Sequence, residues 1–450
     1  MREATRPMPA ADARRWLPWL IALAGFAFDI AAYWPGQMSF DSAYAWWQAR
    51  NGTTLGIVPP AFVLVWRACT MFTAGPAPMF VLHLLLFWSG LTLFVRALRF
   101  APARAVMVML IVAFTPVPWL LRGHVWTDVG VLSALACASG VLATAQASGR
   151  RAWLLPALPL LLYAAALRHN ALPAVLPFAL WFAWLAGRRG NACEWRRSAL
   201  AAIGVVASAV LLTQALNTTV RERVPAWPML AQFDLAAMSI DTQQMLLPAF
   251  IVGPGLDVPD LAQAFREWSN LPLLVNTRHG LHAPFEPFSD DDLALLRHTW
   301  LNSIAAHPRA WLAHRWRLTR ALFGAHAADW PRELLYVDDE VVYRDNPPVA
   351  RNTGVLHVTL MSAAAAVAAT TVLAPWPYLL LGLVSLPAAW RRRRSPAGAI
   401  ALVLLASGSL YALSFTLLAV SAELRYLGWP CVACLLAAAC AWLAPSGAAR

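Results

Sequence analysis

The chain has 450 residues, of which 60% are hydrophobic and only 13% are charged, and its mean hydropathy is +0.55. This composition excludes an ordinary soluble protein, whose wetted surface needs more charge, and predicts an all-α polytopic membrane protein. The net charge of +12 rests on arginine, because the sequence contains no lysine. In a membrane protein such an excess typically marks the cytoplasmic face, so no nucleic-acid partner is expected.

Ten apolar runs are long enough to cross a bilayer as helices. They lie roughly at 16–34, 76–98, 104–121, 128–147, 152–167, 171–187, 199–216, 372–390, 397–420 and 426–443. Arginines gather in every second linker, at 2–15, 96–104, 150–151, 188–197 and 391–394. By the positive-inside rule these linkers and both termini are cytoplasmic, and the remaining linkers face the outer side.

The polar stretch between spans seven and eight divides the chain into three predicted domains. These are an N-terminal membrane domain at 1–216, a small outer domain at 217–354, and a C-terminal membrane domain at 355–450. The middle domain holds many of the acidic residues and lies on the outer side by the same topology.

Two stretches of the membrane domains do not fit as spans. The first outer loop, 35–75, carries helix candidates at 41–50 and 58–67, which we expect to lie in the interface with Trp46, Trp47 and Trp66 at headgroup depth. The alanine-rich segment 355–371 is interpreted as an interfacial or re-entrant helix. Counting it as a span would place the arginines at 391–394 on the outer side.

The outer domain contains two further predicted helices. Ser289 is a good N-cap for a helix that starts at Asp290-Asp-Asp292, and acidic residues suit the positive end of the helix dipole. Capping is therefore the preferred interpretation of this triplet, although a hard cation is an alternative. The segment 306–320 is amphipathic and rich in arginine and tryptophan, which favours a membrane-surface helix over a contact for a lipid-linked phosphate.

Four polar turns follow or precede spans on the predicted outer side. They contain Asp41; Arg122, His124 and Asp128; Arg168, His169 and Asn170; and Glu423, Arg425 and Tyr426. Each alone has a plain structural explanation, such as helix capping, snorkelling or a local ion pair. Ionisable groups beside hydrocarbon are costly unless they are paired or face a wet cavity, so together these turns predict one site. Asp29, inside span one, would pair with a neighbouring arginine or line the same cavity.

These turns resemble the GT-C superfamily of integral membrane glycosyltransferases, which use polyprenyl-phosphate-linked sugars. Phe40-Asp41-Ser42, followed by two interfacial helices, looks like the acidic first outer loop of that superfamily. The resemblance extends to Trp126-Thr-Asp128, Arg168-His-Asn170 and Glu423-Leu-Arg-Tyr426. Uncharacterised bacterial membrane proteins are similar in the segment 37–98. The first loop departs from many members in carrying Ser42 where a second acidic residue stands.

The resemblance implies an inverting transfer of a sugar to a cell-envelope glycan, lipid or protein acceptor at the outer face of the bacterial inner membrane. Asp41 would be the base that takes the acceptor proton. Asp128 would orient the acceptor or, with Asp41, hold a divalent cation; no other cofactor is implied. Arginine binds phosphate through its planar fork, so Arg168 and Arg425 would hold the leaving polyprenyl phosphate. His169 or Arg122 would assist, and His124, Asn170, Glu423 and Tyr426 complete the expected substrate-binding set.

Two other classes of function remain open from the sequence. A lipid or glycolipid transporter would bury ionisable residues at mid-bilayer, where this chain has few, namely Asp29, Arg67 and His83. A non-catalytic envelope assembly protein would act through its outer domain. The gathering of polar turns at one face favours the transferase.

Overall fold

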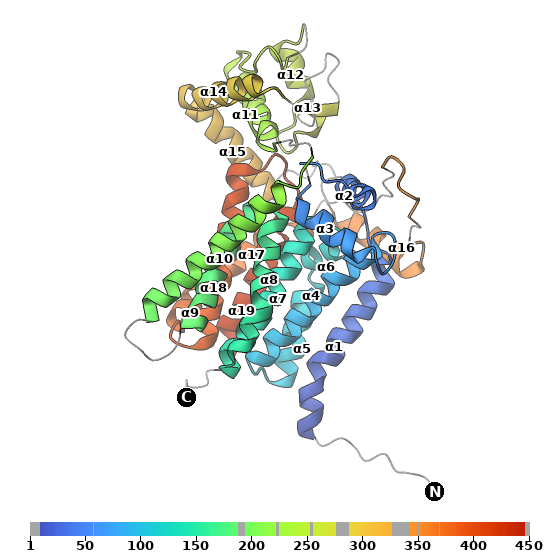
Figure 1. The fold of residues 1–450 in the computed structure, drawn as a ribbon, viewed down its shortest axis with the longest axis vertical. Helices are drawn as coiled ribbons and strands as arrows, with labels where there is room; N and C mark the ends of the chain where they lie inside the picture. The colour runs from blue at the N-terminus through green and yellow to red at the C-terminus, as the bar shows by residue number, and fades with distance from the viewer. Residues whose placement is uncertain are drawn as a thin grey trace.

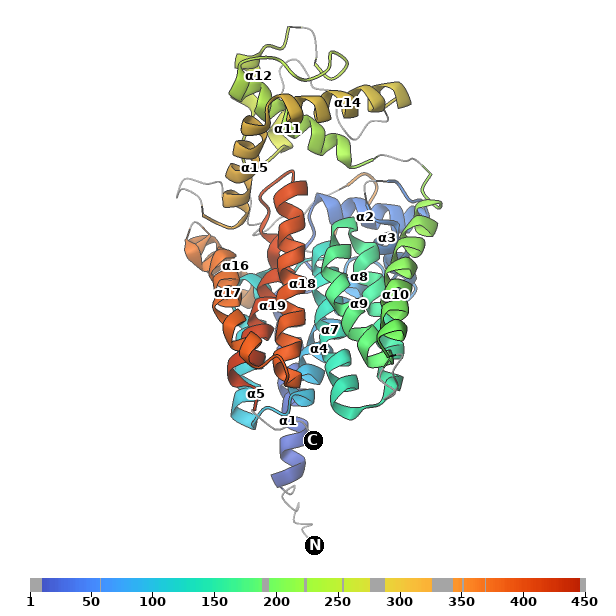
Figure 2. The same ribbon diagram turned by 90° about the vertical axis from the view of Figure 1, so that its left-hand side faces the viewer.

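The computed structural model describes residues 10–56, 58–187, 194–221, 225–252, 255–275, 288–325, 343–349, 352–368 and 370–445. Parts of the predicted outer domain and of the arginine clusters at 2–15 and 188–197 lie outside these ranges. Within them the chain is helical, with isolated β-bridges in place of strands, which confirms the all-α prediction. Most helices stand side by side in one bundle, and the helices of the middle region gather beyond one end (Figures 1 and 2). We call this the outer end.

Seven helical segments of the described ranges are long and apolar enough to cross a membrane. They are α1 (Ala10–Tyr33), α4 (Ala77–Ala97), α7 (Thr127–Ser148), η2 (His169–Ala171) with α9 (Leu172–Gly187), α10 (Glu194–Asn217), α18 (Pro396–Leu418), and η5 (Leu424–Leu427) with α19 (Gly428–Ala438) and η6 (Ala439–Leu443). Each coincides with a predicted span, so the chain is a multi-pass membrane protein. α1 begins and η6 ends at the end of the bundle opposite the outer end (Figure 1).

The count of ten spans is not confirmed, because three predicted spans take other forms. The first is split into α5 (Pro102–Phe114) and α6 (Pro116–Arg122), which meet at 65°. Thr115 is extended there, and Pro116 has no N–H to continue the helix. The other two are η1 (Arg151–Trp153) with the 14-residue α8 (Leu154–Leu167), and the 16-residue α17 (Trp376–Arg391). These shorter helices lie beside the spans (Figure 2).

α7 is the central helix of the bundle, and almost all of its residues are buried. It packs closely on α4 through glycines, since a Cβ on Gly140 would lie 2.1 Å from the carbonyl oxygen of Gly90. Small residues allow such backbone contact between membrane helices. Asp128 lies in the first turn of α7, so this central position buries its side chain at the outer end of the bundle.

The first outer loop forms α2 (Phe40–Asn51) and α3 (Pro60–Cys69), as predicted. Trp46 and Trp66 are buried within the protein, with exposed fractions of 2% and 0%, and their predicted depth at the headgroups stays a prediction. The ring of Trp66 packs edge-on against Phe62 at 5.4 Å, and its indole N–H donates to the carbonyl of Gly75 at 3.0 Å. The indole N–H of Trp47 donates to Asp345, 2.6 Å away.

The segment 355–371 forms α16 (Val355–Val367) and the short η4 (Thr371–Leu373). With 13 residues, α16 is too short to cross a bilayer, in agreement with its interpretation as a non-spanning helix. It contacts α1, and His357 Nδ1 lies 2.7 Å from the carbonyl oxygen of Ala32.

The described part of the middle region is a group of helices at the outer end. They are α11 (Trp227–Thr242), α12 (Val258–Ala264), α13 (Leu271–Val275), α14 (Asp290–Ala306) and α15 (Pro308–Leu322). Ser289 caps α14 by accepting the backbone N–H of Asp292 at 3.1 Å, which confirms the capping interpretation of the aspartate triplet.

α15 is the predicted arginine- and tryptophan-rich helix, but two of its arginines do not face a membrane surface. Arg315 is bonded to Asp234 of α11, and Arg317 pairs with Asp241 of the same helix at 3.1 Å. At these positions α15 packs on α11, through a buried ion pair at Arg315 and a partly exposed one at Arg317.

Candidate active site

The loop before α2 is joined to the loop before α7. Gly36 has a φ of +105°, and a Cβ there would lie 2.9 Å from Phe80 and Val125, so the turn requires glycine. Beyond the turn, the N–H of Gln37 donates to the carbonyl of Gly123 at 2.8 Å, and its carbonyl accepts the N–H of Val125 at 2.9 Å. The start of α2 is thereby fixed beside the start of α7.

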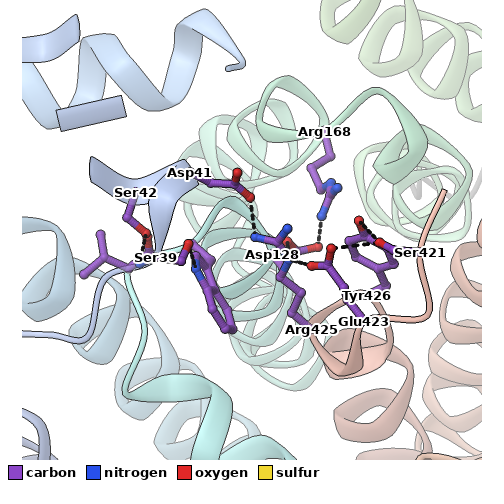
Figure 3. A network of polar contacts seen from close by, with 11 residues as sticks. Ser39, Asp41, Ser42, Asp128, Arg168, Ser421, Glu423, Arg425 and Tyr426 are labelled. Atoms are coloured by element: carbon purple, nitrogen blue, oxygen red, sulfur yellow. Dashed lines mark hydrogen bonds and ion pairs between the residues drawn. The ribbon is translucent and has the colours of Figure 1, made fainter. Parts of the chain in front are cut away.

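Two side-chain hydrogen bonds strengthen this junction. The hydroxyl of Ser42 donates to the carbonyl of Val125 at 2.6 Å, and the indole N–H of Trp126 donates to Ser39 Oγ at 2.8 Å. Asp41 and Asp128 each occupy the first turn of their helix, so the junction brings two carboxylates together. Both are directed toward the guanidinium of Arg425 (Figure 3).

Arg425, in η5, is the centre of the polar network. Its Nη1 lies 2.6 Å from Asp41 Oδ2, and its Nε lies 3.8 Å from Asp128 Oδ2. The same Nε also pairs with Glu423. The indole ring of Trp126 lies under the guanidinium, with 5.1 Å between the guanidinium carbon and the ring centroid. Arg425 thus links η5 to both α2 and α7.

Arg168 is the second guanidinium of the network. It stands at the break between α8 and η2, where an extended backbone ends the helix, and it is bonded to Asp128. Its guanidinium carbon lies 4.9 Å from the ring centroid of Tyr426 and 5.5 Å from that of Phe415. These two rings are stacked on one another at 4.5 Å and form the wall behind the arginine.

Glu423 is held by the loop that carries it. Ser421 Oγ donates to Glu423 Oε1 at 2.7 Å and lies 3.2 Å from the hydroxyl of Tyr426. The loop therefore places a carboxylate, a hydroxyl and a phenol next to Arg425 (Figure 3).

The three carboxylates of the network differ in exposure. The side chain of Asp41 is 57% exposed, whereas those of Asp128 and Glu423 are 3% and 10% exposed. The two guanidiniums, Arg168 and Arg425, are 21% and 10% exposed. The network carries three negative and two positive charges, and its open edge is at Asp41.

Arg122 was expected to bind phosphate, and the structure corrects this. Its side chain and that of Asp29 are fully buried, with Arg122 Nη2 3.1 Å from Asp29 Oδ2. Trp88 donates its indole N–H to the same oxygen at 2.9 Å, and the ring of Phe87 lies 4.4 Å from the guanidinium carbon. The expected pairing of Asp29 with an arginine is confirmed. A guanidinium so enclosed has no face left for a ligand.

Three other predicted residues lie beside the network. His124 is 3% exposed and stacks on the ring of Trp126 at 4.0 Å, with its Nδ1 3.1 Å from the carbonyl of Leu120. It therefore supports the junction from within. His169 is exposed next to Arg168, and the carbonyl of the half-buried Asn170 accepts the hydroxyl of Ser414 at 3.3 Å. Their expected roles toward a substrate stay predictions.

A divalent cation shared by Asp41 and Asp128 does not fit this arrangement. The guanidinium of Arg425 lies between the two carboxylates, where such a cation would have to bind. Over the residues that the structure describes, no group of three His, Cys, Asp or Glu side chains is arranged to hold a metal ion.

Two residues of the network were missing from the sequence prediction, namely Ser39 and Ser421, and Trp126 was part of a predicted motif without a role of its own. Ser39 lies two residues before Asp41, and Ser421 lies two residues before Glu423. A hydroxyl or indole next to a charged motif was the available signal, because buried charges need neutral hydrogen-bonding partners.

No protein-family model and no curated protein matches the chain. Among solved structures, the chain is similar to the crystal structure of ArnT from Cupriavidus metallidurans bound to undecaprenyl phosphate. The two share 15% sequence identity and a TM-score of 0.34, over 95% of this chain and 77% of that one.

Proposed function

We propose that this protein is a membrane glycosyltransferase. It would move a sugar from a polyprenyl-phosphate donor to a cell-envelope acceptor at the outer face of the bacterial inner membrane, with both termini in the cytoplasm. The observation that carries the proposal is an exposed carboxylate, Asp41, bonded at 2.6 Å to the largely buried guanidinium of Arg425. Arg168 provides a second guanidinium beside the same network.

In the proposed reaction the carboxylate and the two guanidiniums have different roles. The acceptor hydroxyl attacks the anomeric carbon of the sugar, and the bond from that carbon to the phosphate oxygen breaks on the opposite face. Asp41 takes the hydroxyl proton as the new glycosidic bond forms. Arg425 and Arg168 stabilise the negative charge that develops on the leaving polyprenyl phosphate.

Donor binding would also release the base. Arg425 is held by the buried Asp128 and Glu423 as well as by Asp41, and only Asp41 is exposed enough to be replaced by an incoming phosphate. An ion pair with an exposed partner contributes little stability, so this exchange costs little. In the free protein Asp41 is tied to Arg425, and in the donor complex its carboxylate is free to accept a proton.

Asp41→Asn tests this division of work, because the amide keeps the size of the side chain but cannot act as a base. We expect transfer to fall by at least ~100-fold. Binding of undecaprenyl phosphate should tighten by about two- to fivefold, since the amide competes less strongly for Arg425. Binding is measured with purified protein in nanodiscs. Transfer is measured as the envelope glycan of a deletion strain that carries each variant at equal protein level.

Asp345→Asn is the matched control, because Asp345 is also an exposed acid bonded to a side chain of α2, with a side chain that is 65% exposed. It should leave binding and transfer unchanged. Normal glycan in the Asp41→Asn strain would exclude Asp41 as the base. Wild-type protein that neither binds undecaprenyl phosphate nor supports any envelope glycan would overturn the proposed function, and lipid movement without transfer would favour a transporter.

A further inference from the structure

We infer that Arg315 of the outer-end helix α15 is a positioning residue for the loop that carries Glu423 and Arg425. Its guanidinium reaches from α15 to the outer end of α18 and donates from Nη1 to the carbonyl of Ala419 at 2.6 Å. Ala419 is the C-cap of α18 and starts the loop toward Glu423. Arg315 matters to catalysis only if the proposed transfer takes place, so this role rests on the proposed function.

Residues 268–270 of the middle region also form backbone hydrogen bonds with this loop. The N–H of Asn270 donates to the carbonyl of Val420 at 3.0 Å, and the N–H of Ala422 donates to the carbonyl of Trp268 at 2.7 Å. Ser269 and Ser421 form an antiparallel bridge between these bonds. The segment 419–422 is thus paired with the segment 268–270, about 150 residues earlier in the chain.

Arg315 is itself held rigidly. Its Nη2 is bonded to Asp234, whose other carboxylate oxygen accepts the indole N–H groups of Trp300 at 3.0 Å and Trp311 at 3.1 Å. The Arg315 side chain is 5% exposed and that of Asp234 is 0% exposed. Carbonyls at the C-terminal end of a helix lack helical partners, and a fixed guanidinium satisfies one of them here.

These contacts at 419–422 affect the position of Arg425 because few residues separate them from it. Ser421, whose hydroxyl donates to Glu423, is two residues from Ala419, and Arg425 is two residues beyond Glu423. Loss of the Arg315 bond frees the start of the loop and lets Arg425 move away from Asp41 and Asp128. The α11–α15 unit then sets the geometry of the phosphate-binding arginine without touching the substrate.

The test uses the pair Arg315→Met and Arg317→Met in the full-length protein. Both remove one guanidinium from α15, but Arg317 pairs with Asp241 and Glu267 instead of the loop. Hydrogen–deuterium exchange of the amides at 419–427 is compared, because the Ala422 N–H reports the docking directly. We expect exchange about tenfold faster in Arg315→Met and unchanged in Arg317→Met. Affinity for undecaprenyl phosphate should fall about fivefold only in Arg315→Met.

Arg315→Met removes the arginine from the buried Asp234, whose remaining partners are His314 and the two indoles. Asp234→Asn with Arg315→Met is therefore the variant that preserves folding if the single change does not. Asp234→Asn alone keeps the bond to Ala419 and should keep slow exchange. Equal exchange at 419–427 in Arg315→Met and wild type, or equal acceleration by Arg317→Met, overturns the inference. If the wild type does not bind undecaprenyl phosphate, the proposed function fails, while the exchange measurement still decides whether Arg315 holds the loop.

Discussion

Arg122 and Arg425 show that enclosure of the partner, more than charge, separates a structural arginine from one that can bind a ligand. Both are buried and bonded to an aspartate. Asp29, the partner of Arg122, is 0% exposed, whereas Asp41, the partner of Arg425, is 57% exposed. An incoming anion can replace a carboxylate only if it can approach the guanidinium. The Asp29–Arg122 pair is closed to such exchange, and the Asp41–Arg425 pair is open to it.

Arg122→Met is therefore expected to destabilise the fold and not to impair the chemistry directly. The change leaves the Asp29 carboxylate buried without its counterion, which in proteins costs about 3–5 kcal/mol. The measurement is the yield and the Tm of the purified variant. A double change, Asp29→Leu with Arg122→Met, removes both charges and should recover most of the loss. A double variant that is stable and yet inactive would place Arg122 back among the substrate-binding residues.

At the scale of elements, apolar length identified seven of the spans, but it did not identify how the chain bends. The predicted span 104–121 reads as one apolar run, whereas the structure breaks it at Thr115–Pro116 by 65°. Proline was visible in the sequence, yet proline also occurs inside α8 at Pro159 and inside α9 at Pro177, where these helices continue. At Pro116 the preceding Thr115 is extended, and Arg122 donates across the break to the carbonyl of Ala113, nine residues earlier. The presence of proline alone does not separate this break from the continuous helices.

The segment 343–349 folds onto α2, the helix that carries Asp41. Asn346, which is buried, donates from Nδ2 to the carbonyl of Ala43 at 2.8 Å and accepts from Arg50 at 3.0 Å. Asn346→Ala removes both bonds, so we expect a loss of about 1–3 kcal/mol in stability. Faster hydrogen–deuterium exchange at 40–51 would report the loosened helix.

The neighbouring Asp345 provides the control for this prediction. It contacts Trp47 and, at 3.9 Å, Arg50, but its side chain is 65% exposed. Exposed pairs contribute about 0–1 kcal/mol, so Asp345→Ala should leave α2 nearly unchanged. If Asp345→Ala loosened α2 as much as Asn346→Ala, the exposed bonds and not the buried amide would hold the helix.

At the scale of the whole molecule, the four polar turns predicted to share one side do meet, because each ends or begins a helix at the outer end. Asp41, Asp128, Arg168 and Arg425 form one network, as their placement in the sequence suggested. The pairing of 268–270 with 419–422 could not be predicted from the sequence. It consists of a few backbone hydrogen bonds, which any residue except proline can donate, so no residue pattern indicates it.

The packing of the middle region also predicts how stability depends on pH. His314 of α15 is 0% exposed and packs edge-on against Phe233 at 4.7 Å, with Nε2 3.4 Å from Asp234 Oδ1. Burial is the largest effect on His314 and lowers its pKa below the usual value of 6.5. The hydrogen bond to Asp234 raises this pKa by less than burial lowers it, and the charges of Arg315 and Arg317 lower it further. Burial alone would raise the pKa of Asp234, but the hydrogen bonds and charges of His314 and Arg315 hold it below 3.8.

These two directions assign a pH window to each group. The unfolded chain takes up a proton on His314 before the folded protein does, so stability is full above pH ~6.5 and falls as the pH drops, by up to about 1.4 kcal/mol per pH unit. The contribution of Asp234 is present above its unfolded pKa of 3.8 and is lost only below that pH. Between pH 7 and 5, exchange of α11 and α15 amides, divided by the intrinsic exchange rate at each pH, should increase in the wild type. In His314→Phe this ratio should stay nearly constant, whereas the exposed control His298→Phe should behave as wild type. A pH dependence that survives in His314→Phe would mean that another group titrates as the α11–α15 unit opens.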